Sequence, residues 1–414
     1  MAQPESTKVH TFIDIDGAPV HAGIAYVTER RNVTTVTFDY DTAYQADPRA
    51  FSLSPDLPLT KTNHHTDGLP KAFSDSAPDR WGRNLIRKRH QAVALSEGRP
   101  TSISEVDYLL GVNDATRQGA LRFALDERGP FVADDTPAGG VPRLIELPRL
   151  LAAADEVAQD PDDMAAIKVL LDAGTGTLGG ARPKASIRDD GRLLIAKFGH
   201  PGDEWDVIAW EKTALDLAEA AGISTPTRQL TRVEGRHILL LERFDRDYTT
   251  TPAGQRLPYI SAMTLLGTSD GASADYLEVA EELTAHGANV NADLAQLWRR
   301  IALSIVINNT DDHMRNHGFI HTIGGWTLAP AFDINPDPDP ARVRASTVGF
   351  TGDPNSTLPQ LLEVAGEFGL TPDTSELILA EVTAAAANWR DIATANGVPP
   401  REQVKFAPAL DRHL

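Results

Sequence analysis

Cysteine is absent from this chain of 414 residues. That absence excludes disulfide bonds, thiolate catalysis and zinc sites built on cysteine sulfur. The chain also lacks any apolar run of the roughly 18 residues that a membrane-spanning helix needs, so we expect no membrane span. Residues 1–8 carry neither the basic nor the apolar segment of a secretory signal. Together these absences indicate a cytoplasmic protein.

Positive charge is scarce, since 39 lysine and arginine residues face 58 aspartate and glutamate residues, for a net charge of −19. Non-specific binding to nucleic acid depends on neutralising phosphates with lysine and arginine. The charge therefore argues against direct DNA binding, and we interpret the basic group at 80–89 as a solvated helix face. The hydrophobic share of 41% and the charged share of 23% are those of an ordinary globular protein.

The first 140 residues are predicted to form a β-rich module with two or three helices. Alternating apolar and polar residues indicate strands, and the turn formers of 46–70 indicate a loop. A Gly/Pro-rich link at 137–142 ends the module. The strands are expected at 9–15, 23–27, 32–38 and 120–123, and the helices are expected to start near Pro78 and at 104.

The remainder is predicted to be mixed and then mostly helical. Periodic apolar residues indicate the helices, and Asn291 and Thr374 stand where amino-terminal caps belong. The expected helices are 147–157, 163–172, 204–221, 276–285, 292–307, 358–368 and 375–393, with β-hairpins around 189–191 and 234–235.

A glycine-rich stretch at 174–184 contains Gly-x-Gly-x-x-Gly. A dinucleotide-binding fingerprint needs a strand before it and a helix after it, whereas here a helix precedes it and a hairpin follows. The dinucleotide interpretation is therefore excluded. A glycine loop ahead of a hairpin whose second strand carries Lys197 is typical of a kinase nucleotide lobe, because glycines let backbone N–H groups approach phosphate. An ordinary loop remains the alternative. Glu211 is either the partner of such a lysine or a surface residue.

An acidic and amide cluster follows the apolar run that ends near 307. Asp311 and Asn316 have the Asp-x-x-x-x-Asn spacing of a kinase catalytic loop, in which the Asp accepts the proton of the attacking hydroxyl and the Asn holds a metal. Asp333 follows a short apolar strand. A second carboxylate delivered in this way suits Mg²⁺, which takes oxygen ligands from one or two carboxylates and from phosphates.

Five motifs in order resemble the HipA family of bacterial serine/threonine kinases, the toxins of type II toxin–antitoxin modules. The resemblance covers nearly the whole length. It implies an α+β, bilobal protein-kinase-like (HipA-like) fold with a β-rich N-terminal subdomain at 1–140, a nucleotide-binding lobe at 141–250 and a mostly helical catalytic lobe at 251–414. The motifs are 73–83, the nucleotide loop 178–184, the hinge 241–246, the catalytic loop 309–316 and the metal segment 331–334.

The resemblance also implies roles for individual residues. Asp311 is expected to be the catalytic base, with Asn316 and Asp333 as Mg²⁺ ligands, and Thr177, with Thr175 nearby, stands where studied members carry a serine that undergoes autophosphorylation. The ATP-binding residues are expected to be Leu178, Gly179, Gly180, Ala181, Lys184, Lys197, Glu242, Arg243, Phe244, His313 and Arg315.

The resemblance further implies a partner and a substrate. A small helix-turn-helix antitoxin, HipB-like, would supply the DNA contacts that this acidic chain lacks, so DNA is reached only indirectly and no membrane is involved. The phosphorylated target is expected to be a protein, with aminoacyl-tRNA synthetases as the known class. The cofactors are expected to be ATP and Mg²⁺.

Two other functions were weighed. A metal-dependent hydrolase would use the His and Asp residues between 311 and 333 to bind two metals, but it leaves the glycine loop and Lys197 without a role. A pseudokinase that binds nucleotide or antitoxin without phosphotransfer is disfavoured by the presence of Asp311, Asn316 and Asp333.

Overall fold

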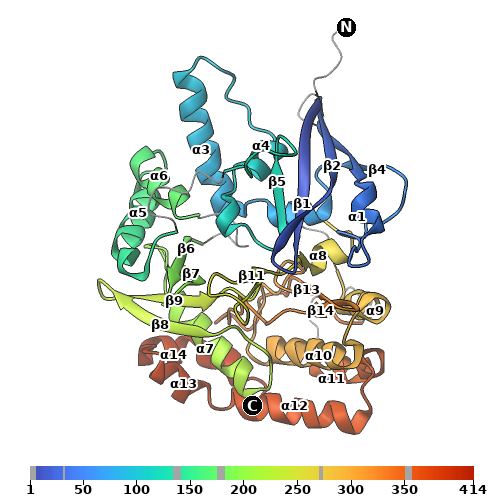
Figure 1. Ribbon diagram of the computed structural model, residues 1–414. Helices are drawn as coiled ribbons and strands as arrows, with labels where there is room; N and C mark the ends of the chain where they lie inside the picture. The colour runs from blue at the N-terminus through green and yellow to red at the C-terminus, as the bar shows by residue number, and fades with distance from the viewer. Residues whose placement is uncertain (1–5, 31–32, 134–140, 175–181, 270–273, 350–356) are drawn as a thin grey trace. The chain divides into compact units, whose positions relative to one another are not determined.

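The chain folds into two compact units, each containing helices and strands (Figure 1). The computed structural model describes residues 6–30, 33–133, 141–174, 182–269, 274–349 and 357–414. Unit 1 comprises Met1–Pro201 and Asp245–Ile260, and unit 2 comprises Gly202–Phe244 and Ser261–Leu414. The predicted α+β class is confirmed. The division into functional parts at 140 and 250 stays a prediction.

Unit 1 contains an antiparallel five-stranded sheet, drawn in blue to teal in Figure 1, with the order β4-β3-β2-β1-β5. Asp16 and Gly17, both with positive φ, form the tight turn between the first two strands, as the twist of a two-residue hairpin requires. Phe73 packs edge-on against Phe38 and Phe123 beside this sheet. The strands are β1 (Ser6–Ile15), β2 (Ala18–Arg30), β3 (Val33–Tyr40), β4 (His64–Asp67) and β5 (Leu121–Ala124).

Two elements of this unit were not predicted. α1 (Thr42–Ala46) is a short helix capped by Asp41, whose side chain accepts from the Ala43 N–H. β4 lies within the stretch predicted to be loop and pairs with β3 at the edge of the sheet. Its sequence, His-His-Thr-Asp, has no apolar residue, so alternation of hydrophobicity could not reveal it. Backbone pairing with β3 alone makes it a strand.

The helices of unit 1 begin where polar caps stand. Asp79 caps α3 by accepting from the Gly82 N–H at 2.7 Å, and Ser104 and Asp107 form a reciprocal capping box on α4. Both observations confirm the predicted helix starts. The helices are α2 (Lys71–Ser76), α3 (Arg80–Ser96), α4 (Glu105–Leu110), α5 (Leu147–Gln159) and α6 (Met164–Asp172), with 3₁₀ turns at Asp114–Thr116 and Leu144–Glu146.

A β-hairpin, β6 (Lys184–Asp189) and β7 (Arg192–Phe198), is formed as predicted. Lys184 stands directly opposite Lys197 in its register, so the two side chains share one face of the hairpin. Lys184 is buried and forms an ion pair with Asp79 at 2.5 Å. Unit 1 also contains the two-residue strands β10 (Arg246–Asp247) and β11 (Gln255–Arg256), which pair with each other.

Unit 2 is mostly helical. Its antiparallel hairpins are β8 (Arg228–Val233) with β9 (Arg236–Glu242), and β13 (Gly318–Thr322) with β14 (Gly325–Leu328). The strand β12 (Tyr259–Ser261) ends at the start of the unit's second segment. The helices are α7 (Val207–Ala220), α8 (Ala262–Leu265), α9 (Tyr276–His286), α10 (Val290–Val306), α11 (Leu358–Glu363), α12 (Pro372–Ala386), α13 (Trp389–Ala395) and α14 (Pro400–Leu410), with a 3₁₀ turn at Ala365–Phe368.

Several predicted details of unit 2 were wrong. The caps are Asn289 and Thr371, not Asn291 and Thr374, because each helix begins earlier than its apolar pattern. The single helix predicted at 375–393 is two helices, broken after Ala386, and the helix predicted at 358–368 changes to a 3₁₀ turn after Glu363. α14 was not predicted.

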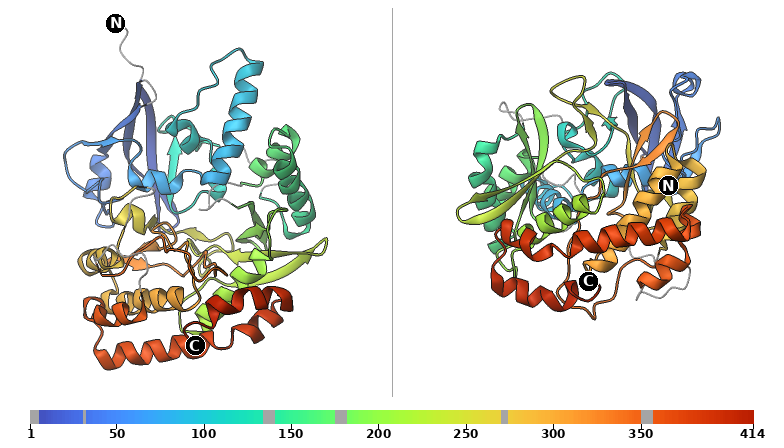
Figure 2. Two further views of the ribbon diagram at one scale, coloured as in Figure 1. Left: turned by 180° about the vertical axis from the view of Figure 1, so that it is seen from behind. Right: turned by 90° about the horizontal axis from the view of Figure 1, so that it is seen from below.

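The carboxy-terminal helices of unit 2 pack against α7 and α10 (Figure 2). Trp210 of α7 stacks on Phe406 of α14 at 3.9 Å and lies 6.0 Å from Trp389 of α13. Glu402 accepts hydrogen bonds from the Trp210 indole N–H and from the Asp206 backbone N–H. These contacts order the first turn of α7. Over the described ranges, no helix has the length and apolar character to cross a membrane.

Removing the Lys184 ammonium should destabilise unit 1 strongly. Both partners of the Lys184–Asp79 pair are almost fully buried, at 2% and 3% exposure, so Lys184→Met strands a buried carboxylate at a cost of about 3–5 kcal/mol. Chemical denaturation measures this loss. The double variant Lys184→Met/Asp79→Asn keeps an oxygen for the α3 cap and should recover part of the stability. An equal loss in the single and double variants would contradict a pairing role.

Candidate active site

The loop that carries Asp311 begins at the end of α10, where the helix is closed by a Schellman motif. The Asn309 N–H donates to the Ser304 carbonyl at 2.9 Å and the Asn308 N–H to the Ile305 carbonyl at 3.3 Å. Asn308 occupies the left-handed region, with φ of 54°, where asparagine is tolerated better than most residues. The helix therefore ends sharply and the chain enters the loop in one defined direction.

The loop itself is tightly turned. The His313 N–H donates to the Asp311 carbonyl at 3.1 Å, and the Asn316 N–H donates to the His313 carbonyl at 2.8 Å. The Asn316 side-chain amide nitrogen donates to the same Asp311 carbonyl at 3.1 Å. This bond orients the amide and leaves its oxygen as the atom suited to a cation.

Asp333 reaches the site through the β13–β14 hairpin. The chain after β14 is held by the Ala329 N–H, which donates to Gly318, and by the Ala331 N–H, which donates to Ser224, both at 2.8 Å. Asp333 has φ of 57°, a conformation that is rare outside glycine and is found at sites where surrounding contacts impose it. Phe332 stacks on the hinge residue Phe244 with ring centroids 5.3 Å apart.

The two aspartates influence each other. Partial withdrawal from water raises the pKa of Asp311, and the charges of Asp333 and Asp312 raise it further, although His313 and Arg342 act in the opposite direction. A bound cation would relieve the repulsion between these carboxylates. Asp311 and Asp333 are therefore brought within electrostatic reach of each other, as the sequence predicts for one site.

The oxygen atoms of Asn316 and Asp333 fit Mg²⁺, which prefers hard oxygen ligands. Among the described residues no group of three or more His, Cys, Asp or Glu side chains could hold a metal ion alone. Mg²⁺ in nucleotide sites uses one or two protein carboxylates and completes its coordination with phosphates and water, so a sparse protein ligand set suits this ion.

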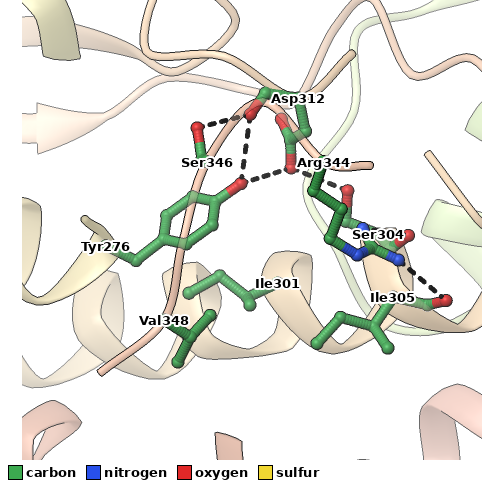
Figure 3. A pocket seen from close by; sticks show the side chains of 8 residues that line it. All are labelled: Tyr276, Ile301, Ser304, Ile305, Asp312, Arg344, Ser346 and Val348. Carbon is green, nitrogen blue, oxygen red and sulfur yellow. Dashed lines mark hydrogen bonds between the residues drawn. The ribbon is translucent and has the colours of Figure 1, made fainter. Parts of the chain in front are cut away.

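Asp312 is buried beneath the loop and accepts hydrogen bonds from three side chains (Figure 3). Tyr276 and Ser304 donate to one carboxylate oxygen at 2.6 and 2.7 Å, and His317 binds the other at 2.9 Å. Burial alone would raise the pKa of Asp312, but the nearby His317 and these hydrogen bonds hold it well below its ordinary value. The carboxylate is therefore ionised and fixed.

Arg344 provides a second clamp under the same loop (Figure 3). Its guanidinium donates to the carbonyls of Ser304 and Asn309, each at 3.0 Å, and to that of Ile305 at 3.2 Å. A cation at the carboxyl end of α10 is favoured by the helix dipole. Ser346 adds a 2.6 Å hydrogen bond to the Asp312 carbonyl. The segment after Asp333 is thus tied to the loop.

The predicted ATP-binding residues are spread over both units. His313 and Arg315 lie in the loop, half-buried, and Glu242, Arg243 and Phe244 end β9 in the same unit. Lys184 and Lys197 belong to unit 1, where Lys184 already pairs with Asp79. Leu178, Gly179, Gly180, Ala181 and the phosphorylation candidates Thr175 and Thr177 lie outside the described residues.

The supporting residues beneath the loop were missed by the sequence analysis. Asp312 received no role as a support, although a second acidic residue at the end of an apolar helix is costly and signals a buried partner. Nothing in the local sequence around Tyr276 or Arg344 indicates that they contact residues more than 30 positions away. Their role follows from the fold alone.

A protein-kinase-like protein is the class that this fold and site define: an α+β chain with an Asp-x-x-x-x-Asn loop after an apolar helix and a further aspartate after a hairpin. Residues 176–389 match the family model of the HipA-like C-terminal domain, and residues 21–109 match that of the HipA N-terminal domain. The chain therefore belongs to the HipA family, as the resemblance of its motifs predicts.

Two known proteins are similar to this chain. The HipA of Shewanella oneidensis MR-1, solved in a toxin–antitoxin complex with HipB and operator DNA, superposes with a TM-score of 0.65 at 18% identity over 98% of this chain and 96% of its own. This likeness supports the fold. A Haemophilus influenzae protein named "Putative kinase" is 25% identical over 144 residues, which are 31% of this chain and 42% of that protein.

The stabilising effect of Asp312 should depend on pH. Because its pKa is lowered in the folded protein, Asp312 contributes stability that is full above its unfolded pKa, about 3.9, and is lost as the pH falls toward the folded value. We expect Asp312→Asn to be less stable than the unmodified protein at pH 7, with the gap narrowing below about pH 4. Urea denaturation at several pH values measures it. A gap independent of pH would contradict an ionised Asp312.

Proposed function

We propose that this protein is an ATP- and Mg²⁺-dependent serine/threonine protein kinase and the toxin of a type II toxin–antitoxin module. The observation that supports it most is the loop at the end of α10, which presents Asp311 beside the amide of Asn316 and within the electrostatic influence of Asp333. A general base and two oxygen ligands for Mg²⁺ are the groups that phosphoryl transfer asks a protein to place.

In this proposal Asp311 is the catalytic base. Its carboxylate accepts the proton of the substrate hydroxyl as the hydroxyl oxygen attacks the γ-phosphorus and the bond to the leaving diphosphate breaks. Its raised pKa strengthens the base while leaving it ionised near neutral pH. Asn316 and Asp333 would hold Mg²⁺, which supplies positive charge for the phosphate oxygens.

The remaining predicted residues are proposed to hold the nucleotide. Lys197 would pair with the phosphates, and the backbone at 179–181 would contact them. Glu242, Arg243 and Phe244 would border the adenine, and the stacking of Phe244 on Phe332 connects that border to the residue before Asp333. Lys184, His313 and Arg315 complete the proposed ATP-binding set.

The proposed substrate is a protein hydroxyl, and an aminoacyl-tRNA synthetase is the class that we favour from the family. Thr177, in the glycine-rich stretch, is the proposed site of autophosphorylation. A helix-turn-helix antitoxin is the proposed partner, because the Shewanella protein of the same fold is found with HipB and operator DNA. With a net charge of −19, this chain would reach DNA only through that partner.

Removing the proposed base should separate catalysis from binding. Asp311→Ala is expected to reduce phosphate transfer by about 10³-fold or more, while ATP affinity stays within a few-fold of the unmodified protein. Asp333→Ala should weaken Mg²⁺-dependent ATP binding as well, because it removes a metal ligand. Transfer from γ-labelled ATP to the protein itself and to proteins of a cell lysate measures the first effect, and calorimetry measures the second.

An exposed aspartate of the same segment, Asp339, offers the control, since Asp339→Ala removes an equal charge outside the proposed chemistry. Transfer that persists in Asp311→Ala at the unmodified rate would overturn the assignment of the base. ATP binding without transfer under every condition would identify a pseudokinase, and absence of ATP binding would overturn the kinase proposal.

The partner proposal is tested on DNA. We expect the isolated chain to leave DNA fragments unshifted in gel electrophoresis, because its acidic surface lacks the cations that phosphates require. Together with a helix-turn-helix protein encoded beside its gene, it should shift that operon's own promoter fragment further than the small protein alone. A shift by this chain alone would contradict the proposal.

A further inference from the structure

A small cavity lies directly beneath the Asp311 loop in unit 2. Its volume is about 20 Å³, and its lining includes Arg300 from α10, Asn309, Asn316, His317 and Phe332. A cavity needs roughly 10–15 Å³ to hold one water molecule, and such water is stable when it has two to four polar partners. The cavity therefore has room for one water molecule.

Three residues of the lining carry buried polar atoms without a hydrogen-bond partner among the described residues. These atoms are Nε and Nη1 of Arg300, Oδ1 of Asn309 and Nδ1 of His317. The residues are only 6%, 2% and 4% exposed. Each unpaired buried polar group costs about 1–3 kcal/mol, so four of them around one small cavity call for a ligand that both donates and accepts.

The rest of each side chain is already fixed. Arg300 donates through Nη2 to the Ala329 carbonyl at 2.5 Å, and His317 binds Asp312 through Nε2. Burial lowers the pKa of Arg300 to about 10, so it remains a cation near neutral pH. Asn309 precedes Asp311, and His317 follows Asn316. The cavity thus lies between the two ends of the proposed catalytic loop and the helix that carries it.

We propose that this cavity is a binding site for an ordered water molecule that joins Arg300, Asn309 and His317 and thereby holds both ends of the Asp311–Asn316 loop against α10. Asn309 is then a positioning residue, which acts on the chemistry through the loop. The presence of the water does not depend on the proposed function, whereas the effect on phosphate transfer rests on it.

Water fits this site better than an anion does. The Arg300 guanidinium would attract an anion, but the Asn309 oxygen and the ionised Asp312 that also lines the cavity would repel it. Water accepts from the guanidinium and donates to the Asn309 oxygen, and it binds Nδ1 of His317 in either tautomer of the ring. Water is therefore the one small ligand that satisfies every partner.

The first test is a crystal structure of the full chain at a resolution that shows ordered water. We expect one electron-density peak within hydrogen-bond distance of Arg300, Asn309 and His317. An empty cavity would overturn the proposal. A peak with the anomalous signal of a bromide soak would also overturn it, since it would identify an anion site.

Two substitutions of Asn309 distinguish a water site from simple packing. Asn309→Leu keeps the volume but removes the polar partner, whereas Asn309→Ala opens space that a second water can fill. With an ordered water, the leucine variant should lose about tenfold in kcat, with the KM for ATP unchanged, and the alanine variant about threefold or less. If Asn309 served only to fill space, the order would be reversed, because the alanine variant leaves a void.

Hydrogen exchange of the backbone amides at 311–316 provides a readout that needs no activity. We expect faster exchange in the leucine variant than in the alanine variant. Asn113 in unit 1 is the matched control, because its Oδ1 is also buried without a partner and it does not line this cavity. Asn113→Leu and Asn113→Ala should leave the exchange of 311–316 unchanged.

If Asn309→Leu fails to fold, Asn309→Ser replaces it. Serine keeps a hydroxyl for the water, so loop exchange and kcat should stay closer to the unmodified protein than in Asn309→Ala. Equal values for the serine and alanine variants would contradict the proposal. A protein without phosphate transfer would remove the kcat arm, and the crystallographic and exchange arms would still decide whether the water is present.

Discussion

The ionised carboxylate of Asp312, buried beneath the loop that carries Asp311, is the constraint on which the candidate site depends. A buried charge is tolerated only when hydrogen bonds replace water, and Tyr276, Ser304 and His317 provide these bonds from α9, α10 and the end of the loop. One carboxylate thereby fixes three parts of unit 2 with respect to one another. The neighbouring Asp311 inherits a defined position without making those bonds itself.

Backbone strain marks the same region. Asn308 and Asp333, which lie at the entrances to the two site segments, both adopt the left-handed conformation. That conformation costs free energy in any residue but glycine, and contacts nearby compensate for it. The Asn308 amide donates to the carbonyls of Asp337 and Asp339, so the strained end of α10 is tied to the segment that follows the strained Asp333.

Local patterns predicted most elements because local physics forms them. The hairpin turn at Asp190 and Gly191, the cap at Asp79 and the periodicity of α10 each involve residues close in sequence. Errors arose where distant contacts decide. β4 has no apolar residue and exists through pairing with β3, and the helix predicted at 375–393 is broken before Trp389, which packs close to Trp210 in the core.

The sequence by itself determined the α+β class, the family and the spacing of Asp311, Asn316 and Asp333, because motifs and periodicity are properties of short segments. Only the tertiary structure decided that Asp312 is an internal anchor, that Arg344 closes α10, and that Arg300, Asn309 and His317 surround one cavity. These residues are distant along the chain, and their chemistry depends on burial. Burial is a property of the folded molecule, which no local pattern encodes.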